Sequence, residues 1–300
     1  MTTDLKISSL AFILVNYCGA DDTIECILSI ENNKYDAPIY IFISDNASPT
    51  KGYEEITSFL ENKDRYIVVS NSEQIVSFNK GHITIIIVKN DCNLGFGYGN
   101  NRALELLKRN YPQCDCCILL NNDTIIPPDF CGKINNYLQK QERPKIAFSA
   151  RSINYFTKEI DSEGFGYINL YTGRSSHRRR YKYSYLVGSC IVITDIPNIP
   201  FFDERYFLYY EDADYSNRLR KEKYILQYDN TNYFYHKVNS TTRQNPAIED
   251  IKKKSMLLFM HSNFPIFVNL RFAVIRVIVY LLTFKFKELS TLIRYYARVS

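Results

Sequence analysis

The sequence lacks an uninterrupted apolar stretch long enough to cross a membrane. Its most apolar window, residues 264–284, is interrupted by Asn269, Arg271 and Arg276, so only residues 277–284 at its far end are uncharged. A membrane-spanning helix needs about 20 consecutive apolar residues. The window therefore predicts an amphipathic helix and argues against a transmembrane span.

A secretion signal and a paired-cysteine metal motif are also lacking. The first apolar run, residues 10–15, has no small-residue cleavage site after it, so we interpret it as a strand of a cytoplasmic protein. The eight cysteines are then expected to be reduced. The cluster CDCC at 114–117 has no second cysteine pair elsewhere, which favours core cysteines over a zinc site.

Tryptophan is absent, whereas the chain has 25 Tyr and 19 Phe residues. Tyrosine offers both stacking area and a hydroxyl group, which suits a polar ligand such as a sugar or a nucleotide. An apolar content of 46% over 300 residues is ample for a packed core and argues against disorder. With no internal repeat or low-complexity segment, we expect one large domain or a domain with an appendage.

Acidic residues are scarce near the C-terminus. Residues 251–300 carry nine Lys and Arg residues against the single acid Glu288, a net charge of +8, which leaves −3 for residues 1–250. This basic, apolar region favours an anionic membrane surface over nucleic acid as a partner. The alternative is ordinary helix packing against the body of the protein.

Strand and helix patterns alternate in the first half of the chain. Apolar runs predict buried strands at residues 9–15, 39–44, 83–88 and 117–120, and amphipathic windows predict helices at about 21–32, 51–62, 98–110 and 128–140. This alternation predicts an α/β fold with a largely parallel sheet and helices on both faces. Residues 64–82 are expected to add a hairpin or an edge strand, and the chain reads as helical from about residue 247.

Polar motifs follow several of these elements. Residues 121–123, Asn-Asn-Asp, come directly after the strand at 117–120, where ligands bind in open α/β sheets, although an Asx-rich turn is the alternative. The other motifs are ISDNAS at 43–48, the Gly-rich NLGFGYGNNRAL at 93–104, and the acidic YYEDADYSNRLRKEKY at 209–224, which is followed by His236. A Gly-rich turn at a helix start can approach a phosphate closely.

In this order, the motifs resemble those of family 2 glycosyltransferases of the GT-A fold, particularly the rhamnosyltransferase- and galactofuranosyltransferase-like branch. The resemblance covers about residues 8–245 and includes D-N-x-S, N-x-G-F-x-x-G-x-N, L-x-N-x-D, a Gly-Ser pair and E-D-x-D. It implies a Rossmann-like GT-A domain over residues 1–245 with a mostly parallel central sheet. Residues 246–300 would then form a helical C-terminal appendage.

The resemblance also implies the parts of the site. Asn16, Tyr17 and Asp45 would border the nucleotide base, and Gly97 and Asn100 would lie near the ribose or the diphosphate. The remaining residues implied for the donor and acceptor are Asn121 and Asn122 on the nucleotide side, and Gly188, Ser189 and Asp214 on the sugar side.

Transfer from a nucleotide-diphosphate sugar needs a divalent cation at the departing diphosphate and a carboxylate that accepts the acceptor's proton. Asp123 is a hard oxygen ligand suited to Mg²⁺ or Mn²⁺. Because an amide replaces the first acid of the usual D-x-D, the resemblance adds His236 as a second metal ligand. It aligns Asp212 with the general base and Glu211 with its orienting partner, and clustered acids raise one another's pKa. An acid-rich helix start is the alternative.

We therefore predict an inverting, metal-dependent glycosyltransferase. Its donor would carry rhamnose, galactofuranose, galactose or a similar sugar, and its acceptor would be a lipid-linked or polysaccharide glycan of a bacterial surface, such as O-antigen or capsule. The protein would be cytoplasmic and peripheral at the inner face of the membrane, with no nucleic-acid partner. Two alternatives remain: a nucleotidyltransferase, disfavoured because residues 15–23 contain no Lys or Arg, and a non-catalytic glycan- or membrane-binding protein with a degenerate fold.

Overall fold

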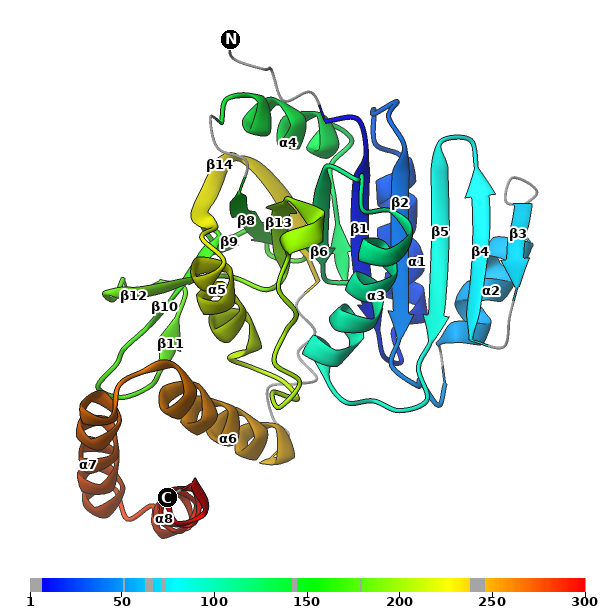
Figure 1. Cartoon of the computed structure of the whole chain (residues 1–300). Helices are drawn as coiled ribbons and strands as arrows, with labels where there is room; N and C mark the ends of the chain where they lie inside the picture. Colours follow the sequence, from blue (N-terminus) through cyan, green and yellow to red (C-terminus); the bar gives the residue numbers. More distant parts are fainter. Residues whose placement is uncertain are drawn as a thin grey trace.

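A computed structural model of the chain describes residues 7–50, 52–62, 67–71, 74–141, 145–178, 180–237 and 246–299. Figure 1 shows one large twisted sheet covered by helices, with three C-terminal helices grouped at one end of the molecule. Among the described residues, the sheet has the strand order β3-β4-β5-β2-β1-β6-β13-β8-β14-β7, and β9 pairs with β8 off this path.

The centre of the sheet is parallel. Its strands are β5 (Ile83–Lys89), β2 (Ile39–Asp45), β1 (Leu10–Asn16) and β6 (Cys116–Leu120), and each pairs in parallel with the next. Helices cover both faces, so these strands are buried on both sides and read as continuous apolar runs. The predicted α/β fold with a mostly parallel central sheet is confirmed.

The second half of the sheet is mixed. Strand β13 (Cys190–Thr194) lies antiparallel between β6 and β8 (Ile146–Asn154), and β14 (Ile225–His236) runs parallel to β8. The short strand β7 (Thr124–Ile125) pairs antiparallel with the end of β14, which sets His236 opposite Thr124. This pairing brings two distant parts of the sequence together beside the polar triplet.

The segment before β5 forms the far edge of the sheet. Strands β3 (Ile67–Asn71) and β4 (Ile75–Lys80) pair antiparallel, and β4 continues antiparallel onto β5. The predicted hairpin within residues 64–82 is thus confirmed. Residues 64–66 and 72–73 lie outside the described residues.

Helices occupy the two faces according to the alternation of side chains along β1. Leu10, Phe12 and Leu14 point to the face covered by α1 (Ala20–Glu31), α2 (Tyr53–Glu61) and α4 (Phe130–Gln139). Ala11 and Ile13 point to the face covered by α3 (Phe96–Asn110) and α5 (Glu211–Lys221). The four predicted helices are confirmed with ends shifted by a few residues, although residue 51 lies outside the described residues.

A small sheet and three helices complete the chain. The sheet has the order β11 (Ser175–Ser176), β10 (Phe165–Ile168) and β12 (Tyr183–Leu186), with β9 (Ile160–Ser162) before it and the 3-10 helix η1 (Ile196–Asn198) after it. Helices α6 (Pro246–Asn263), α7 (Ile266–Leu282) and α8 (Phe286–Val299) follow. The predicted domain boundary at residue 245 lies outside the described residues.

The C-terminal helices share a core cluster with the body. Phe259 and Met260 of α6 and Phe272 of α7 are buried together with Tyr206 and Tyr210 of the body. Burial of such large side chains stabilises by roughly 1.5–3 kcal/mol each, so this cluster fixes the helices in place. The packing alternative for the tail is therefore correct for one face of these helices.

All eight cysteines lie within the described residues and are free. Cys116 and Cys117 are fully buried in β6, and burial raises the pKa of both thiols well above the ordinary value. Cys116 packs in one core cluster and Cys117 in the other, so the two thiols point to opposite faces of the sheet and cannot bind one ion together. The interpretation of the CDCC cluster as core residues is confirmed.

Candidate active site

A buried polar network closes the carboxyl ends of the central strands. Asn16 at the end of β1 donates from Nδ2 to Oδ2 of Asp45 at the end of β2, at 2.6 Å. The same oxygen accepts a hydrogen bond from Oγ of Ser48 at 2.8 Å, and Oδ1 of Asn16 accepts one from Nδ2 of Asn122 at 3.3 Å. Asp45 is only 1% exposed, so these internal contacts hold the ends of β1, β2 and β6 in register.

Tyr17, next to this network, is 52% exposed and offers its ring at the sheet edge where a nucleotide base is predicted. Asn122 also donates from Nδ2 to Oγ1 of Thr23 at 2.8 Å, which ties the triplet to α1. The structure therefore brings Asn16, Tyr17, Asp45 and Asn122 to one edge. Their contact with a nucleotide stays a prediction.

The glycines at the start of α3 are required by close packing. Gly95 has a φ of +104°, and a Cβ there would lie 2.2 Å from the carbonyl oxygen of Phe207. A Cβ on Gly99 would lie 2.7 Å from Cγ1 of Val15. Gly97 is buried in the same turn, so this part of the Gly-rich motif lets α3 begin against the body of the protein.

Asn100 on α3 is also buried, and its Nδ2 donates to the carbonyl oxygen of Phe96 at 2.9 Å. Asn46 donates from Nδ2 to the carbonyl oxygen of Gly95 at 3.0 Å, which joins the D-N-x-S turn to the Gly-rich turn. The two motifs are thus neighbours in space. The predicted roles of Gly97 and Asn100 near a ribose or a diphosphate stay predictions.

Asp123 and His236 form a close acid–imidazole pair. Oδ1 of Asp123 lies 3.1 Å from Nε2 of His236, and their side chains are 17% and 14% exposed. Nδ2 of Asn121 lies 3.4 Å from the same Nε2, and the backbone N–H of Asn121 donates to the carbonyl oxygen of Ser189 at 3.0 Å. The pairing of β7 with β14 thus assembles the two residues predicted as metal ligands.

This pair fits a divalent cation. An octahedral ion with bonds of 2.0–2.1 Å holds adjacent ligand atoms about 3 Å apart, close to the separation of Oδ1 and Nε2. The carboxylate of Asp123 suits Mn²⁺ or Mg²⁺, and the imidazole of His236 favours Mn²⁺ of the two because Mg²⁺ prefers oxygen ligands. No group of three or more His, Cys, Asp and Glu side chains able to hold a metal occurs among the described residues.

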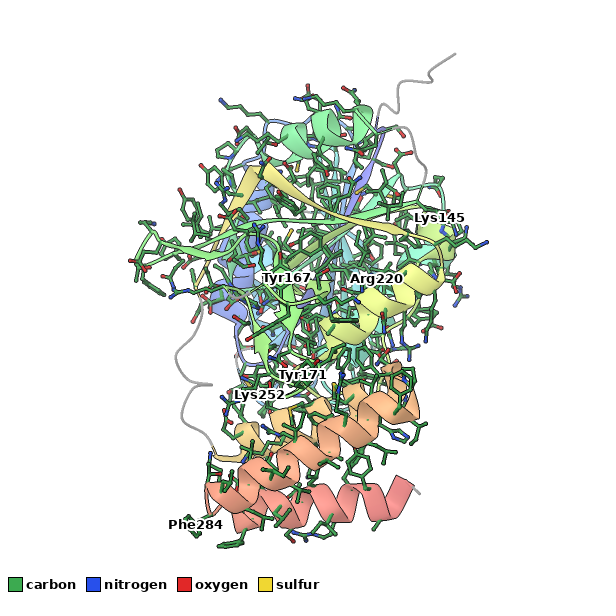
Figure 2. All side chains as sticks on the ribbon, turned by 90° about the vertical axis from the view of Figure 1, so that its left-hand side faces the viewer. Lys145, Tyr167, Tyr171, Arg220, Lys252 and Phe284 are labelled. Atoms are coloured by element: carbon green, nitrogen blue, oxygen red, sulfur yellow. The ribbon has the colours of Figure 1, made fainter. Side chains whose placement is uncertain are left out.

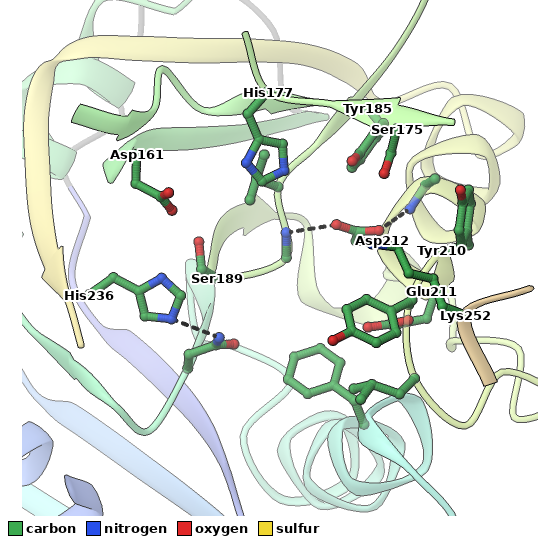
Figure 3. Close-up of a pocket in the computed structure, with 17 residues that line it drawn as sticks. Asp161, Ser175, His177, Tyr185, Ser189, Tyr210, Glu211, Asp212, His236 and Lys252 are labelled. Atoms are coloured by element: carbon green, nitrogen blue, oxygen red, sulfur yellow. Dashed lines mark hydrogen bonds between the residues drawn. The ribbon is translucent and has the colours of Figure 1, made fainter. Parts of the chain in front are cut away.

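Two strained residues aim the start of α5. Tyr209 and Tyr210 have φ values of 68° and 65°, a left-handed conformation that is costly for bulky side chains and typical of functional turns. The hydroxyl of Tyr210 donates to the carbonyl oxygen of Gly173 at 2.8 Å, which holds the turn. As a result, the carboxyl groups of Glu211 and Asp212 face a pocket beside the sheet (Figure 3).

The two acids differ in protonation. Backbone N–H groups of Gly188 and Ala213 donate to the carboxylate of Asp212 at 3.3 and 2.8 Å. Burial raises the pKa of Asp212 to about 6, whereas burial and then the charge of Asp212 raise the pKa of Glu211 to about 8. Two buried neighbouring acids favour a single negative charge near neutral pH, and the two N–H contacts stabilise that charge on Asp212, which can accept a proton.

One pocket of about 340 Å³ brings the predicted base together with part of the predicted metal and sugar sites. Figure 3 shows His236 and Asp212 on opposite sides of this pocket. The sequence-predicted residues that line it are Asn121, Gly188, Ser189, Glu211, Asp212 and His236. Of the other nucleotide-side residues, Asn16, Tyr17, Asp45 and Asn122 lie at the adjoining sheet edge, and Gly97 and Asn100 lie at the start of α3. Asp123 adjoins the pocket through His236.

Other lining residues were not identified from the sequence. They are Phe96, Asp161, Ser175, His177, Tyr185, Val187, Leu208, Tyr209, Tyr210, Ala213 and Lys252. The sequence does carry one signal for two of them, the basic stretch RSSHRRRYK at residues 174–182, which contains Ser175 and His177. Arg178 and Arg180 of this stretch line a neighbouring pocket. Arg179 of that loop lies outside the described residues.

Asp214 does not line the pocket. Its carboxylate accepts hydrogen bonds from Nε of Arg218 at 2.7 Å and from Nδ2 of Asn263 at 2.8 Å. Arg218 also pairs with Asp203 at 2.7 Å. These contacts join α5 to α6 and to the preceding loop, so the position of Asp214 supports a structural role in place of the predicted sugar contact.

No known protein family matches the sequence, and no curated protein matches it. Solved structures resemble the chain despite low identity. TarS 1–349 of S. aureus in complex with UDP superposes with a TM-score of 0.53 at 10% identity, covering 91% of this chain and 72% of that one. The mannosyltransferase PcManGT of Pyrobaculum calidifontis, in complex with GDP-Man and Mn²⁺, gives 0.54 at 12% identity, covering 96% and 74%.

GalNAc-T7 with UDP, GalNAc and Mn²⁺ gives a TM-score of 0.53 at 14% identity, covering 78% of this chain and 44% of that one. Together these similarities show that the chain has the GT-A fold, as the motif resemblance implied.

Proposed function

We propose that this protein is an inverting, metal-dependent glycosyltransferase that uses a nucleotide-diphosphate sugar. The observation that carries the proposal is one pocket with Asp212 and His236 on opposite sides (Figure 3), which Asn121, Gly188 and Ser189 also line. A base on one side and a cation-binding pair on the other leave space for a sugar that is attacked from the side opposite its leaving group. The GT-A neighbours bound to UDP or GDP-Man support such a donor.

Each residue has a defined task in the proposed reaction. The base of the donor lies near Tyr17 at the sheet edge, and its diphosphate is directed toward Asp123 and His236. When bound there, a divalent cation neutralises charge that develops on the leaving diphosphate.

Asp212 removes the proton from the acceptor hydroxyl. At the same time the hydroxyl oxygen of the acceptor bonds to the anomeric carbon, and the bond between that carbon and the diphosphate oxygen breaks. The configuration inverts in one step, and the proton remains on Asp212 until it passes to solvent. The N–H groups of Gly188 and Ala213 keep the Asp212 carboxylate ionised and oriented.

A panel of nucleotide sugars tests the proposal. The panel includes UDP-GlcNAc, UDP-GalNAc, GDP-mannose, and the donors of rhamnose, galactose and galactofuranose. With Mn²⁺ present, the matching nucleoside diphosphate should raise the melting temperature, since a ligand at about 100 times its Kd stabilises by about 2.7 kcal/mol. The matching sugar donor should also release nucleoside diphosphate when an acceptor is supplied.

The panel also separates the alternatives. Consumption of a nucleoside triphosphate with release of inorganic diphosphate would indicate a nucleotidyltransferase. Stabilisation by glycans alone, without any nucleotide effect or release of diphosphate, would indicate a non-catalytic binding protein. Either result contradicts the proposal.

We propose rhamnose, galactofuranose, galactose or a similar sugar as the sugar that is transferred, and a lipid-linked or polysaccharide glycan of a bacterial surface as the acceptor.

The C-terminal helices provide the proposed contact with the inner face of the membrane. None of the helices within the described ranges is long and apolar enough to cross a bilayer. One face of α7 nevertheless exposes apolar side chains at helical spacing, and the most exposed is Phe284, at 78%, just after the helix. The residues of this outward face are Ile266, Leu270, Val274, Ile278, Leu282 and Phe284.

Figure 2 shows Phe284 at the end of the molecule away from the sheet. The exposed cations Lys285 and Lys287 are close in sequence, and the +8 charge of residues 251–300 complements an anionic lipid surface. The opposite face of α7, with Val268 and Phe272, is buried against the body. The outward face is therefore free to lie in the headgroup region while the body stays in water.

Changing Leu282 and Phe284 together to glutamate should weaken binding to phosphatidylglycerol vesicles by about 10–100-fold, because two apolar anchors are lost and two like charges are added. Phe156→Glu, which alters an exposed aromatic residue of the body, should leave binding unchanged. Vesicle co-sedimentation at low and high salt measures both. Vesicle binding that the double variant leaves intact would contradict the membrane assignment.

A further inference from the structure

A second pocket lies among the C-terminal helices. It measures about 340 Å³ and is lined by α6, by α7 with the turn that follows it, by Glu288 of α8 and by the turn before β11. Five cationic side chains line it: Arg174, Lys252, Lys253, Arg276 and Lys285. None of them has a part in the reaction described above, so this concentration of positive charge needs its own explanation.

Arg276 of α7 is buried in this pocket without an acidic partner. It is 8% exposed, and its guanidinium donates to the hydroxyl of Tyr280 at 2.6 Å and lies 4.7 Å from the centre of that ring. Its Nε is buried and makes no hydrogen bond, and no acid among the described residues forms an ion pair with it. Burial of an unpaired charge is costly, which points to an anion that supplies the missing contact.

The charged side chains that line the pocket have an excess of positive charge. Glu288 pairs with Lys253 at 3.3 Å, and the remaining acid, Glu249, is exposed at the rim. The five cations therefore outnumber the acids by three. Planar guanidinium groups bind the oxygens of phosphate with two parallel hydrogen bonds, so an anion with several oxygens and more than one charge suits Arg276 and its neighbours.

The position of the pocket indicates what carries the anion. It shares Ser175, Tyr210 and Lys252 with the catalytic pocket, and Tyr210 directly precedes Glu211. On its other side it is lined by Thr283 and Lys285, which flank the exposed Phe284 of the outward face. A molecule with a phosphate between a sugar and a lipid would place its sugar beside Asp212, its phosphate at Arg276 and its lipid at the membrane.

We propose that this helical pocket binds the phosphate or diphosphate group of a lipid-linked acceptor and thereby sets the sugar of that acceptor beside Asp212. The assignment to an acceptor rests on the proposed glycosyl transfer, whereas the anion site itself does not. The pocket recognises the phosphate oxygens through Arg276 and Lys285 and leaves the lipid to the outward face of α7.

Calorimetry with farnesyl diphosphate, in the presence of a chelator and without nucleotide, tests the site. The full chain should bind farnesyl diphosphate, and Arg276→Gln should weaken binding by about 10–100-fold, the usual loss for a buried charge-assisted contact. Lys285→Gln changes an exposed side chain, so this variant should fold normally. It should weaken the binding of farnesyl diphosphate by about 3–10-fold. Arg294→Gln removes an equal charge from α8 outside the pocket and should have no effect.

Four results would overturn the proposal. If farnesol binds with the same affinity as farnesyl diphosphate, the lipid alone is recognised. If inorganic diphosphate binds with that affinity, the site is one for a free anion. Phosphatidylglycerol vesicles whose binding depends on Arg276, without binding of farnesyl diphosphate, would assign the site to bilayer headgroups. Unchanged binding by both Arg276→Gln and Lys285→Gln would exclude the pocket altogether.

The same measurements separate this inference from the proposed enzyme activity. If no sugar donor is turned over but farnesyl diphosphate binds through Arg276, the anion site stands and the transferase assignment fails. If transfer occurs and Arg276→Gln leaves the KM for a lipid-diphosphate acceptor unchanged, the transferase stands and the acceptor site is wrong. In the expected result, Arg276→Gln raises that KM by about 10-fold or more while the UDP or GDP affinity stays constant.

Discussion

Asp123→Ala should lower sugar transfer by at least about 10²-fold, because loss of the cation at a departing diphosphate removes several kcal/mol of transition-state stabilisation. Asp123 is the only acid of its triplet and lies 3.1 Å from His236, so the imidazole alone would have to hold the ion. The variant should also lose the additional thermal stabilisation that Mn²⁺ gives in the presence of the nucleoside diphosphate. Initial rates and melting temperatures with and without EDTA measure both effects.

Two further substitutions make this result specific. Asp123→Asn keeps the shape but removes the charge, and it should lose nearly as much activity as the alanine variant. Asp129→Ala removes an exposed acid that pairs only with Lys133 on α4, and it should behave like the unaltered protein. If Asp123→Ala retains near-normal activity in EDTA, the metal assignment is wrong.

The central sheet was predictable because its physical signal is local. Each parallel strand is buried on both faces and therefore reads as an apolar run, as Ile83–Lys89 does, with polar residues where it ends. The register that sets Asn16 beside Asp45 follows from parallel pairing of two such strands. The antiparallel insertion of β13 between β6 and β8 was not predictable, because it depends on which distant strands meet.

The pocket was only partly predictable for the same reason. The resemblance in motif order implied Asp212 and His236, because the combination of motifs is more specific than any one of them. Asp161 reaches the pocket from β9, His177 from the residue after β11, and Lys252 from α6. The packing of these elements leaves no local pattern in the sequence. Such side chains become visible only when the elements that carry them are placed.

Asp214 shows a different limit. It follows Asp212 by two residues, and two helical steps turn the side chain by about 200°. Helix geometry thus places Asp214 on the opposite face of α5, where Arg218 and Asn263 hold it. The spacing of two residues between Asp212 and Asp214 is enough to predict that their side chains lie on different faces of the helix.

The sequence of the C-terminal region fits both packing and surface binding, and the structure shows why both patterns are present. Phe272 and Tyr280 of α7 are buried against the body, whereas Leu270, Val274 and Ile278 are exposed. A helix with apolar side chains on both faces has a weak amphipathic pattern in sequence. Only the placement of the body distinguishes the face that packs from the face that is free.

Asp212→Asn should lower kcat by about 10²–10⁴-fold, the usual contribution of a general base, while the affinity for the nucleoside diphosphate stays nearly unchanged. The amide preserves the shape of the side chain and the contact with the N–H of Gly188, and Asp212 lies across the pocket from His236. Because burial raises the pKa of Asp212 to about 6, kcat/KM should fall about tenfold per pH unit below that value. This acidic limb should disappear in the variant.

Glu211→Gln is the matched comparison. Burial and the neighbouring charge raise the pKa of Glu211 to about 8, so the native side chain is already neutral near pH 7, and the amide should cost only about 3–10-fold in kcat. It should keep the acidic limb that belongs to Asp212. The reverse ranking, with Glu211 essential and Asp212 dispensable, would assign the base to Glu211. A weaker nucleotide affinity with unchanged kcat in Asp212→Asn would show that this acid holds the donor, and proton transfer would then need another residue of the pocket.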